Sequence, residues 1–189
     1  MNVIMTRVEN KLKLFNTVRE KSSAKVFAEW NKHEAFVYDE EDCEKVENRA
    51  LSTTAEGHLF LGEWNDKNEA HGKGIRLTKE GMLEEGYWRN GNLEGKGRLF
   101  FPCGTVYSGH LHHHKQSGRG TQQWIDGDRY EGEWKNGVEE GKGTFSWKDG
   151  RRYEGDWVED AMTGVGNFVF ASGNRYVGQW LNNMRHGKG

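Results

Sequence analysis

The chain has 189 residues, a hydrophobic content of 34%, a charged content of 30% and a mean hydropathy of -0.96, which together exclude a thick globular core. An aromatic content of 12%, including 8 Trp, is not that of a disordered chain, and 26 Gly beside a single Pro predict many tight turns. The formal net charge of -2 gives no sign of a polyanionic partner.

Neither the cysteines nor the hydropathy pattern indicates export or membrane insertion. Cys43 and Cys103 form no CxxC pair, so we expect free thiols in a reducing compartment. No apolar run approaches the length of a membrane span, and the N-terminus lacks the apolar core of a signal peptide. We therefore expect a soluble, cytoplasmic protein.

Residues 1–56 are predicted to form an N-terminal arm, partly helical, that precedes the rest of the fold. Apolar residues recur every three or four positions at its start, which predicts an amphipathic helix. These positions are Ile4, Val8, Leu12, Phe15 and Val18. The next segment, residues 24–38, fits either a helix or a strand. Its apolar residues include Val26, Phe27, Trp30 and Val37.

Charge is divided unevenly along this arm. Residues 1–33 hold seven Lys and Arg against three Glu, whereas residues 34–56 hold eight acidic residues against Lys45 and Arg49. The acidic run from Asp39 to Glu44 lacks the ligand spacing and the turn glycine of an EF-hand, so we interpret it as a solvated connector. The basic helix can fold back on its own sheet, bind a partner or lie on a membrane. Folding back is favoured, because it covers apolar surface of an aromatic-faced sheet at the lowest cost.

From residue 57 to residue 189 the sequence repeats with a period of 23 residues. The first signature is aromatic-x-Gly-x-Trp, as in "YEGEW" at residues 130–134. The second is Gly-x-Gly, whose first glycines are Gly72, Gly95, Gly118, Gly141, Gly164 and Gly187. A glycine such as Gly150 closes each complete unit. Three markers with one period predict a tandem repeat array of five units and the first part of a sixth.

Each repeat is predicted to be a β-hairpin. Tyr130, Gly132 and Trp134 alternate with acidic residues, which is the period-two pattern of a half-buried strand. The stretch "GTFSWKDG", residues 143–150, alternates in the same way and ends in an Asp-Gly pair that tolerates the positive φ of a tight turn. We expect a mainly β fold, a single-layer antiparallel meander of tandem hairpins in which each unit contacts its neighbours.

The triplet Gly141-Lys142-Gly143 has some likeness to a phosphate-binding loop. A P-loop places four residues between its glycines and a Ser or Thr after the Lys. Here three residues separate Gly137 from Gly141, and Gly143 stands where the hydroxyl belongs. The triplet also recurs through the repeats, with Val165 replacing the Lys in one of them. We therefore interpret the glycines as backbone devices that allow close approach beside aromatic rings.

Tyr-Glu-Gly-x-Trp followed by Gly-Lys-Gly-x-Phe at this period resembles the MORN repeat family. The resemblance covers residues 57–189, with Glu84 in place of the Tyr, Leu111 in place of the Trp and Gln122 in place of the second-strand aromatic. It implies a non-enzymatic scaffold that holds a partner helix or an extended peptide along its aromatic face, in a cytoskeletal, ciliary or flagellar assembly. The alternative is a phosphoinositide- or membrane-associated regulatory module of a larger enzyme or junctional protein.

The aromatic side chains of this face are the candidate partner-binding residues. They are Tyr107, Tyr130, Trp134, Phe145, Trp147, Tyr153, Trp157, Phe168, Phe170, Tyr176 and Trp180. A lone hairpin is marginal in water, so the same residues can instead serve only to hold the sheet together. The sequence leaves both interpretations open.

We expect no catalytic, cofactor or metal site. The chain has no G-x-S-x-G, H-E-x-x-H or kinase motif, and a thin sheet is a poor source of water-excluding pockets. The histidines of "HLHHH", residues 110–114, match the exposed hairpin loop of other repeats, and no carboxylate or cysteine of that unit completes a ligand set. Residues 58–189 hold 18 Lys and Arg and 18 Asp and Glu, so nucleic acid is not expected and membrane lipid is not favoured.

The C-terminal repeats are predicted to pair two copies of the chain. The sequence stops midway through a repeat, which would leave the strand from Tyr176 to Trp180 without a hairpin partner. An open strand edge invites pairing with another chain. We therefore expect a homodimer, with truncation of a longer protein as the alternative.

Overall fold

The computed structural model describes residues 16–18, 20, 24–33, 36, 47–48 and 50–189. The apolar positions from Ile4 to Phe15, the acidic run at residues 39–44 and Val37 lie outside the described residues. The chain divides into two compact units, Met1–Val106 and Tyr107–Gly189, which we describe one at a time. The boundary expected between residues 56 and 57 marks where the repeat pattern begins, and it stays a prediction.

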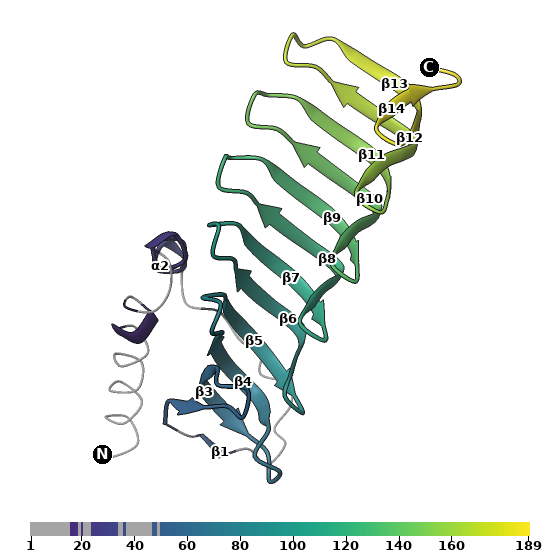
Figure 1. The fold of residues 1–189 in the computed structure, drawn as a ribbon. Coiled ribbons are helices and arrows are strands. Elements are labelled where there is room, and N and C mark those ends of the chain that lie inside the picture. The colour runs from purple at the N-terminus through teal and green to yellow at the C-terminus, as the bar shows by residue number, and fades with distance from the viewer. Residues whose placement is uncertain (1–15, 19, 21–23, 34–35, 37–46, 49) are drawn as a thin grey trace. The chain divides into compact units, whose positions relative to one another are not determined.

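The first unit joins a short helix to a run of antiparallel strands (Figure 1). Its elements are α2 (Ala24–Lys32), β1 (Glu47–Asn48), β2 (Ser52–Thr53), β3 (Leu59–Trp64), β4 (Ala70–Leu77), β5 (Leu83–Arg89) and β6 (Asn92–Phe100). Strands β3 to β6 are neighbours in chain order, and β1 and β2 both pair with β3. The segment that fits either a helix or a strand by its sequence is helical through Lys32.

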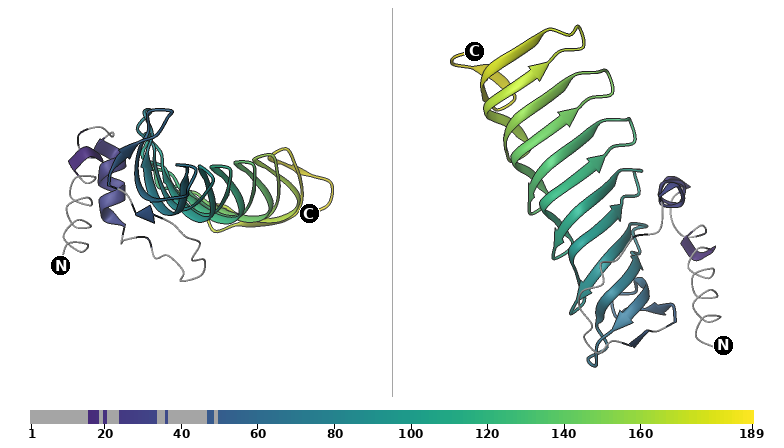
Figure 2. Two further views of the ribbon diagram at one scale, coloured as in Figure 1. Left: turned by 90° about the horizontal axis from the view of Figure 1, so that it is seen from below. Right: turned by 180° about the vertical axis from the view of Figure 1, so that it is seen from behind.

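The second unit is a meander of hairpins. Its strands are β7 (Val106–His112), β8 (Lys115–Gln123), β9 (Arg129–Lys135), β10 (Val138–Ser146), β11 (Arg152–Val158), β12 (Ala161–Val169), β13 (Arg175–Leu181) and β14 (Met184–His186). Each strand is antiparallel to the next, and both views in Figure 2 show the strands of this unit as one layer. The expected mainly β fold is confirmed. The expectation that the strand of Tyr176 lacks a hairpin partner is wrong, because β14 pairs with β13.

Two-residue turns of left-handed backbone close the hairpins. Asn136 and Gly137 between β9 and β10 have φ of 52° and 92°, and Asn182 and Asn183 between β13 and β14 have φ of 48° and 65°. Positive φ at both central residues is the geometry that matches the twist of the flanking strands. His113 and His114 have the same geometry, so the histidine stretch is a strand end followed by a turn, as expected from the repeat alignment.

The two glycines of each Gly-x-Gly pair have different tasks. Gly141 has a φ of 71° and lies within a register shift between Glu139 and Gly143, so it provides the left-handed backbone of a β-bulge. Gly143 is opposite Gly132 on β9, and a Cβ at Gly143 would lie 2.3 Å from the Oη of Tyr130. The second glycine therefore makes room for an aromatic ring, which confirms the interpretation of the triplet as a packing device.

The sheet presents two chemically different faces. Phe145 is opposite Tyr130, and Thr144 is opposite Glu131, so the strand alternation places aromatic residues on one side and polar residues on the other. We name the side of Tyr130, Trp134 and Phe145, with the equivalent positions of other repeats, the aromatic face. The side of Glu131 and Thr144, with their equivalents, is the reverse face.

In the first unit the helical segment covers the reverse face. Val18 and Val26 are fully buried against a cluster that contains Leu77, Leu83 and Phe100. Phe27, Trp30, Leu51, Leu59, Leu61 and Ile75 are packed against the same cluster. The described helical residues thus pack on their own sheet, as the favoured alternative predicts, but they cover the reverse face and not the expected aromatic face. The reason is chemical: the aliphatic residues of the first repeats lie on the reverse face.

The helices in the described part of the chain include none with the length and apolar character needed to cross a bilayer. Helix α2 has 9 residues.

Candidate partner-binding face

A ladder of Tyr and Trp rings runs through the second unit. Tyr130 lies edge-to-face with Trp134 of its own strand, at 5.1 Å between centroids, and with Trp157 of the next repeat, at 5.3 Å. Tyr153 repeats the arrangement with Trp157 at 5.3 Å and Trp180 at 5.4 Å. Each Tyr therefore joins two consecutive hairpins through the geometry that aromatic quadrupoles prefer.

Hydrogen bonds fix the polar ends of these rings. The hydroxyl of Tyr130 donates to the carbonyl of Glu133 at 3.0 Å, and that of Tyr153 donates to the carbonyl of Asp156 at 3.1 Å. The indole N–H of Trp157 donates to the carbonyl of Gly143 at 3.2 Å. Burial raises the pKa of Tyr153 to about 12, so its phenol keeps the proton that it donates.

The ladder residues are almost completely enclosed. Tyr107, Tyr130 and Tyr153 have no exposed surface, and Trp134, Trp157 and Trp180 are between 4% and 6% exposed. These residues contact one another and backbone carbonyls, so their observed role is to hold the sheet together. Their contact with a partner stays a prediction.

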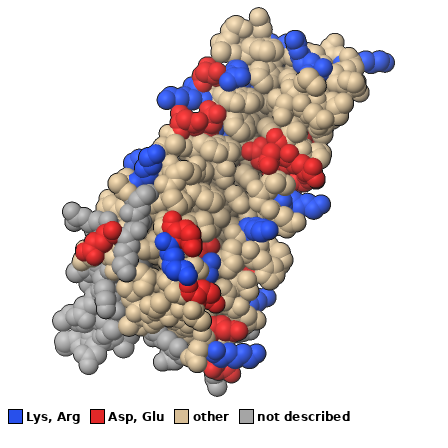
Figure 3. All heavy atoms as spheres, viewed as in Figure 1, with Lys and Arg blue, Asp and Glu red and all other residues tan. Residues whose placement is uncertain are grey.

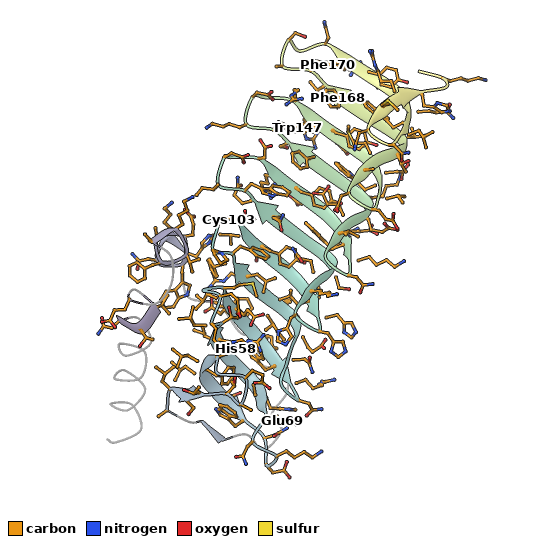
Figure 4. The ribbon with its side chains drawn as sticks, in the orientation of Figure 1. His58, Glu69, Cys103, Trp147, Phe168 and Phe170 are labelled. Carbon is orange, nitrogen blue, oxygen red and sulfur yellow. The ribbon has the colours of Figure 1, made fainter. Side chains whose placement is uncertain are left out.

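A second set of aromatic residues lies on the same face but is only half-buried. Phe145 contacts Trp124 at 5.2 Å and Trp147 at 4.5 Å between ring centroids, and Phe168 contacts Trp147 at 5.5 Å and Phe170 at 4.7 Å. We name these five residues the aromatic strip; four of them are half-buried, and Phe168 is 6% exposed. Figure 4 labels Trp147, which follows β10, and Phe168 and Phe170, which lie near the end of β12 and just after it.

Sequence reasoning found four members of this strip and missed Trp124. That residue precedes Trp147 by one repeat period of 23 residues and Phe170 by two, so the repeat alignment contained the signal. Tyr176, the remaining candidate, is half-buried and lies against Trp180 at 5.5 Å. Arg151 lies over the ring of Trp147 at 5.0 Å and pairs with Asp149, which places both charges at the border of the strip.

A family model for the MORN repeat matches residues 85–106, 107–129, 130–151, 153–175 and 176–189. The chain belongs to the MORN repeat family. The hairpin of β3 and β4 precedes the matched residues but has the MORN geometry, since Phe60 lies edge-to-face with Trp64 and Trp88 at 5.2 Å and 5.1 Å. The family is a non-enzymatic repeat module.

Comparison with curated proteins finds no sequence relative. Among solved structures, the TCP domain of Drosophila melanogaster SAS-4 (dCPAP), in complex with a proline-rich motif of Ana2 (dSTIL), is similar with a TM-score of 0.45 and 11% identity over 77% of this chain and 86% of that one. The wild-type TCP10 domain of Danio rerio CPAP has a TM-score of 0.28 and 12% identity over 67% of this chain and 75% of that one. At these scores neither structure bears on the partner of this MORN chain.

In the first MORN repeats, one departure from the repeat signature is compensated by a second substitution on the neighbouring strand. Glu84 occupies a Tyr position and is fully buried, and Arg76 on the neighbouring strand occupies the Phe position opposite it. The two side chains form an ion pair, and the guanidinium of Arg76 lies 4.9 Å from the centroid of Trp88. A buried charge pair with an aromatic neighbour thus replaces the aromatic pair of later repeats. At another of these departures, Leu111 fills a Trp position and is 3% exposed.

One carboxyl of the second unit is buried beside the ladder. Glu139, opposite Trp134 on β10, is 5% exposed. Burial, and next the charge of Asp160, raise the pKa of Glu139 to about 8. Its backbone N–H donates to Oδ1 of Asp160 at 2.7 Å, a bond that Met162 and Asn183 repeat one hairpin later at 2.8 Å. The backbone bond is therefore part of the MORN stacking, whereas the buried carboxyl is particular to this repeat.

Proposed function

We propose that this MORN chain is a non-enzymatic scaffold that binds a protein partner, a helix or an extended peptide, along its aromatic strip. The observation that carries the proposal is the difference between the two aromatic sets. The Tyr–Trp ladder is enclosed and already joins the hairpins. Trp124, Phe145, Trp147 and Phe170 keep part of their ring surface in solvent, and aromatic side chains are enriched where proteins bind one another.

Charge supports a protein partner over a polyanion. The repeats carry equal numbers of acidic and basic residues, 18 of each between residues 58 and 189. Several of these are paired with each other on the reverse face, as in Arg129 with Glu131 and Arg152 with Glu154. Such a surface lacks the net positive field that phosphate backbones or anionic lipids require. A cytoplasmic site in a cytoskeletal, ciliary or flagellar assembly is part of the proposal, by analogy with other MORN proteins.

Co-purification with a Trp147→Ser/Phe170→Ser variant tests the scaffold proposal. Both rings are half-buried, so the fold should survive, which circular dichroism and thermal unfolding check. The matched control is Val158→Ser, which removes an apolar side chain that is 47% exposed from the reverse face. We expect a partner to be retained by the wild type and the control and lost by the double variant. Equal retention of the partner by all three proteins would show that the aromatic strip does not bind it.

Lipid association is tested separately by flotation of the full chain with phosphatidylcholine and phosphatidylserine vesicles at about 0.15 M salt. The scaffold proposal expects no flotation. Flotation that the Trp147→Ser/Phe170→Ser variant abolishes would replace it with the alternative, a membrane-associated regulatory module.

A homodimer through the C-terminal repeats is a further proposal, and we rank it behind a protein partner. Residues 161–189 carry Arg175, Arg185 and Lys188 and no acidic residue. Two copies that meet at these repeats would bring like charges together. Sedimentation of the chain at micromolar concentration distinguishes a stable dimer from a monomer.

A further inference from the structure

We propose that the reverse face of the last two repeats is a second docking site, which takes an amphipathic helix with an acidic polar side from a partner protein. The site lies on the opposite side of the sheet from the aromatic strip, so it does not rest on the function proposed above.

Four exposed apolar side chains form the site. Val165 is 58% exposed, Val177 57%, Leu181 47% and Met184 67%. Val165 is opposite Gln179, which lies between Val177 and Leu181 on β13, and Met184 is opposite Leu181 on β14. Residues opposite one another or two apart along a strand share one face of a sheet. We name these four residues the C-terminal apolar patch.

The repeat itself does not require apolar residues at these positions. One repeat earlier, Lys142 stands at the position of Val165 and Glu154 at that of Val177. At the position of Leu181 the preceding repeat has Val158, and the repeat before that has Lys135. Lys142 and Glu154 form ion pairs on the surface, with Asp156 and Arg152. Since a MORN hairpin folds with charged residues there, the apolar residues of the last repeats serve something other than the hairpin.

The first unit shows what covers the reverse face where it is apolar. Leu61 occupies the repeat position of Val177, and it is packed against the cluster that Val18 and Val26 of the helical segment complete. The partly buried Phe27 and Trp30 of that segment are packed there too. An amphipathic helix is therefore the ligand that this surface already accepts within the same chain.

Charge decides which helix fits the C-terminal apolar patch. Residues 161–189 contain Arg175, Arg185 and Lys188 and no Asp or Glu, and the charged groups at the upper right end of the view in Figure 3 are blue. The carboxylate of Asp156, which accepts a hydrogen bond from the backbone N–H of Val165 at 3.0 Å, is paired with Lys142. The N-terminal segment of a second copy is not complementary, because residues 1–33 hold seven Lys and Arg against three Glu. The same patch of a second copy is basic as well. An acidic partner helix is the complementary occupant.

The test uses the full chain and a fluorescent synthetic helix of about 18 residues with a Leu face and a Glu polar face. A second peptide, the control, has the same Leu face with Lys in place of Glu. The variant Val165→Lys/Val177→Glu installs the residues of the preceding repeat, so the fold is retained and the net charge is unchanged. The control variant Ile125→Gln removes an apolar side chain that is 54% exposed and lies in the turn after β8, away from the C-terminal apolar patch.

We expect the acidic peptide to bind the wild type and the control equally, and to bind the double variant about ten-fold or more weakly. The lysine peptide should bind all three weakly. Absence of acidic-peptide binding, equal binding of the lysine peptide, or no loss in the double variant would overturn the proposal. So would vesicle flotation or dimerisation that the double variant abolishes, since the occupant would then be a membrane or a second copy.

Discussion

The ring of Tyr130 lies directly against Gly143 of the neighbouring strand, where a Cβ would come within 2.3 Å of its hydroxyl oxygen and 2.5 Å of Cζ. Gly143 is opposite Gly132 and Gly155 on the strands to either side, so these three glycines form a flat backbone surface against which the rings of the ladder pack. The Gly-x-Gly signature and the aromatic signature are thus two halves of one contact.

Gly143→Ala should lower the free energy of unfolding by about 3 kcal/mol, because neither the ring nor the paired backbone can give way. Urea unfolding followed by tryptophan fluorescence measures the change. Gly150→Ala is the control, since Gly150 has a φ of 90° but nothing within 4 Å of a Cβ, and it should cost about 1 kcal/mol. Equal costs at the two positions would contradict the packing role of Gly143.

Tyr130→Phe should be tolerated with a loss of about 1 kcal/mol. The substitution removes the hydrogen bond to the carbonyl of Glu133, at 3.0 Å, and leaves the two edge-to-face contacts with tryptophan in place. Phe60 already occupies this position in the first hairpin, with a Cβ at Gly74 only 2.3 Å from its ring. Unfolding of the whole array by this one change would show that the hydroxyl, and not the ring, stabilises the stack.

Glu139→Met should raise the stability of the chain at pH 8 by about 1–3 kcal/mol, because a buried carboxyl is replaced by the residue that the next repeat carries, Met162. The folded chain holds the proton on Glu139 up to a pKa of about 8, whereas the unfolded chain releases it near 4.5. Stability of the wild type therefore falls as the pH rises through this window.

Thermal unfolding of both proteins across that pH range checks the assignment. The difference in stability between Glu139→Met and the wild type should be smallest near pH 4.5 and grow until about pH 8. Glu140→Met is the matched control, one residue away and outside the buried positions, and it should show no such trend. A constant difference across the range would contradict the burial of an ionisable Glu139.

Val26→Asp should release the helix from the first unit. It places a charge in the cluster where Val26 is fully buried, so the reverse-face residues Leu77 and Phe100 would become accessible. Increased binding of the dye ANS at unchanged strand content measures the exposure. Ala28→Asp puts the same charge on an exposed position of α2 and should leave dye binding as in the wild type.

The hairpins were predictable because their determinants are local. The glycine that needs positive φ and the alternation of residues 130–134 lie within one repeat, so the period of 23 residues reveals both. The ion pair of Arg76 with Glu84 was not predictable in this way, because Glu84 alone looks like a defect in the signature. Its meaning depends on the strand register, which places a residue of the preceding repeat opposite it.

The candidate site was predictable only in part. Strand periodicity assigns a residue to a face but says nothing of its depth, so the enclosed Tyr153 and the half-buried Trp147 had equal standing in the sequence. The sequence also did not reveal which face of the sheet the helical segment covers, for a related reason. The aliphatic alternation of Leu59, Leu61, Ile75 and Leu77 was present in the sequence, but the helix seat becomes visible only when these strands are paired.

The central claim, that a partner binds along the aromatic strip, is tested most directly by site-specific photo-crosslinking in the full chain. A photoreactive phenylalanine analogue replaces Trp147 in one sample and Glu131, which is exposed on the reverse face of β9, in another. We predict a single crosslinked protein partner from position 147 and no such product from position 131. Identical products from both positions, or a product from position 131 alone, would contradict the proposal.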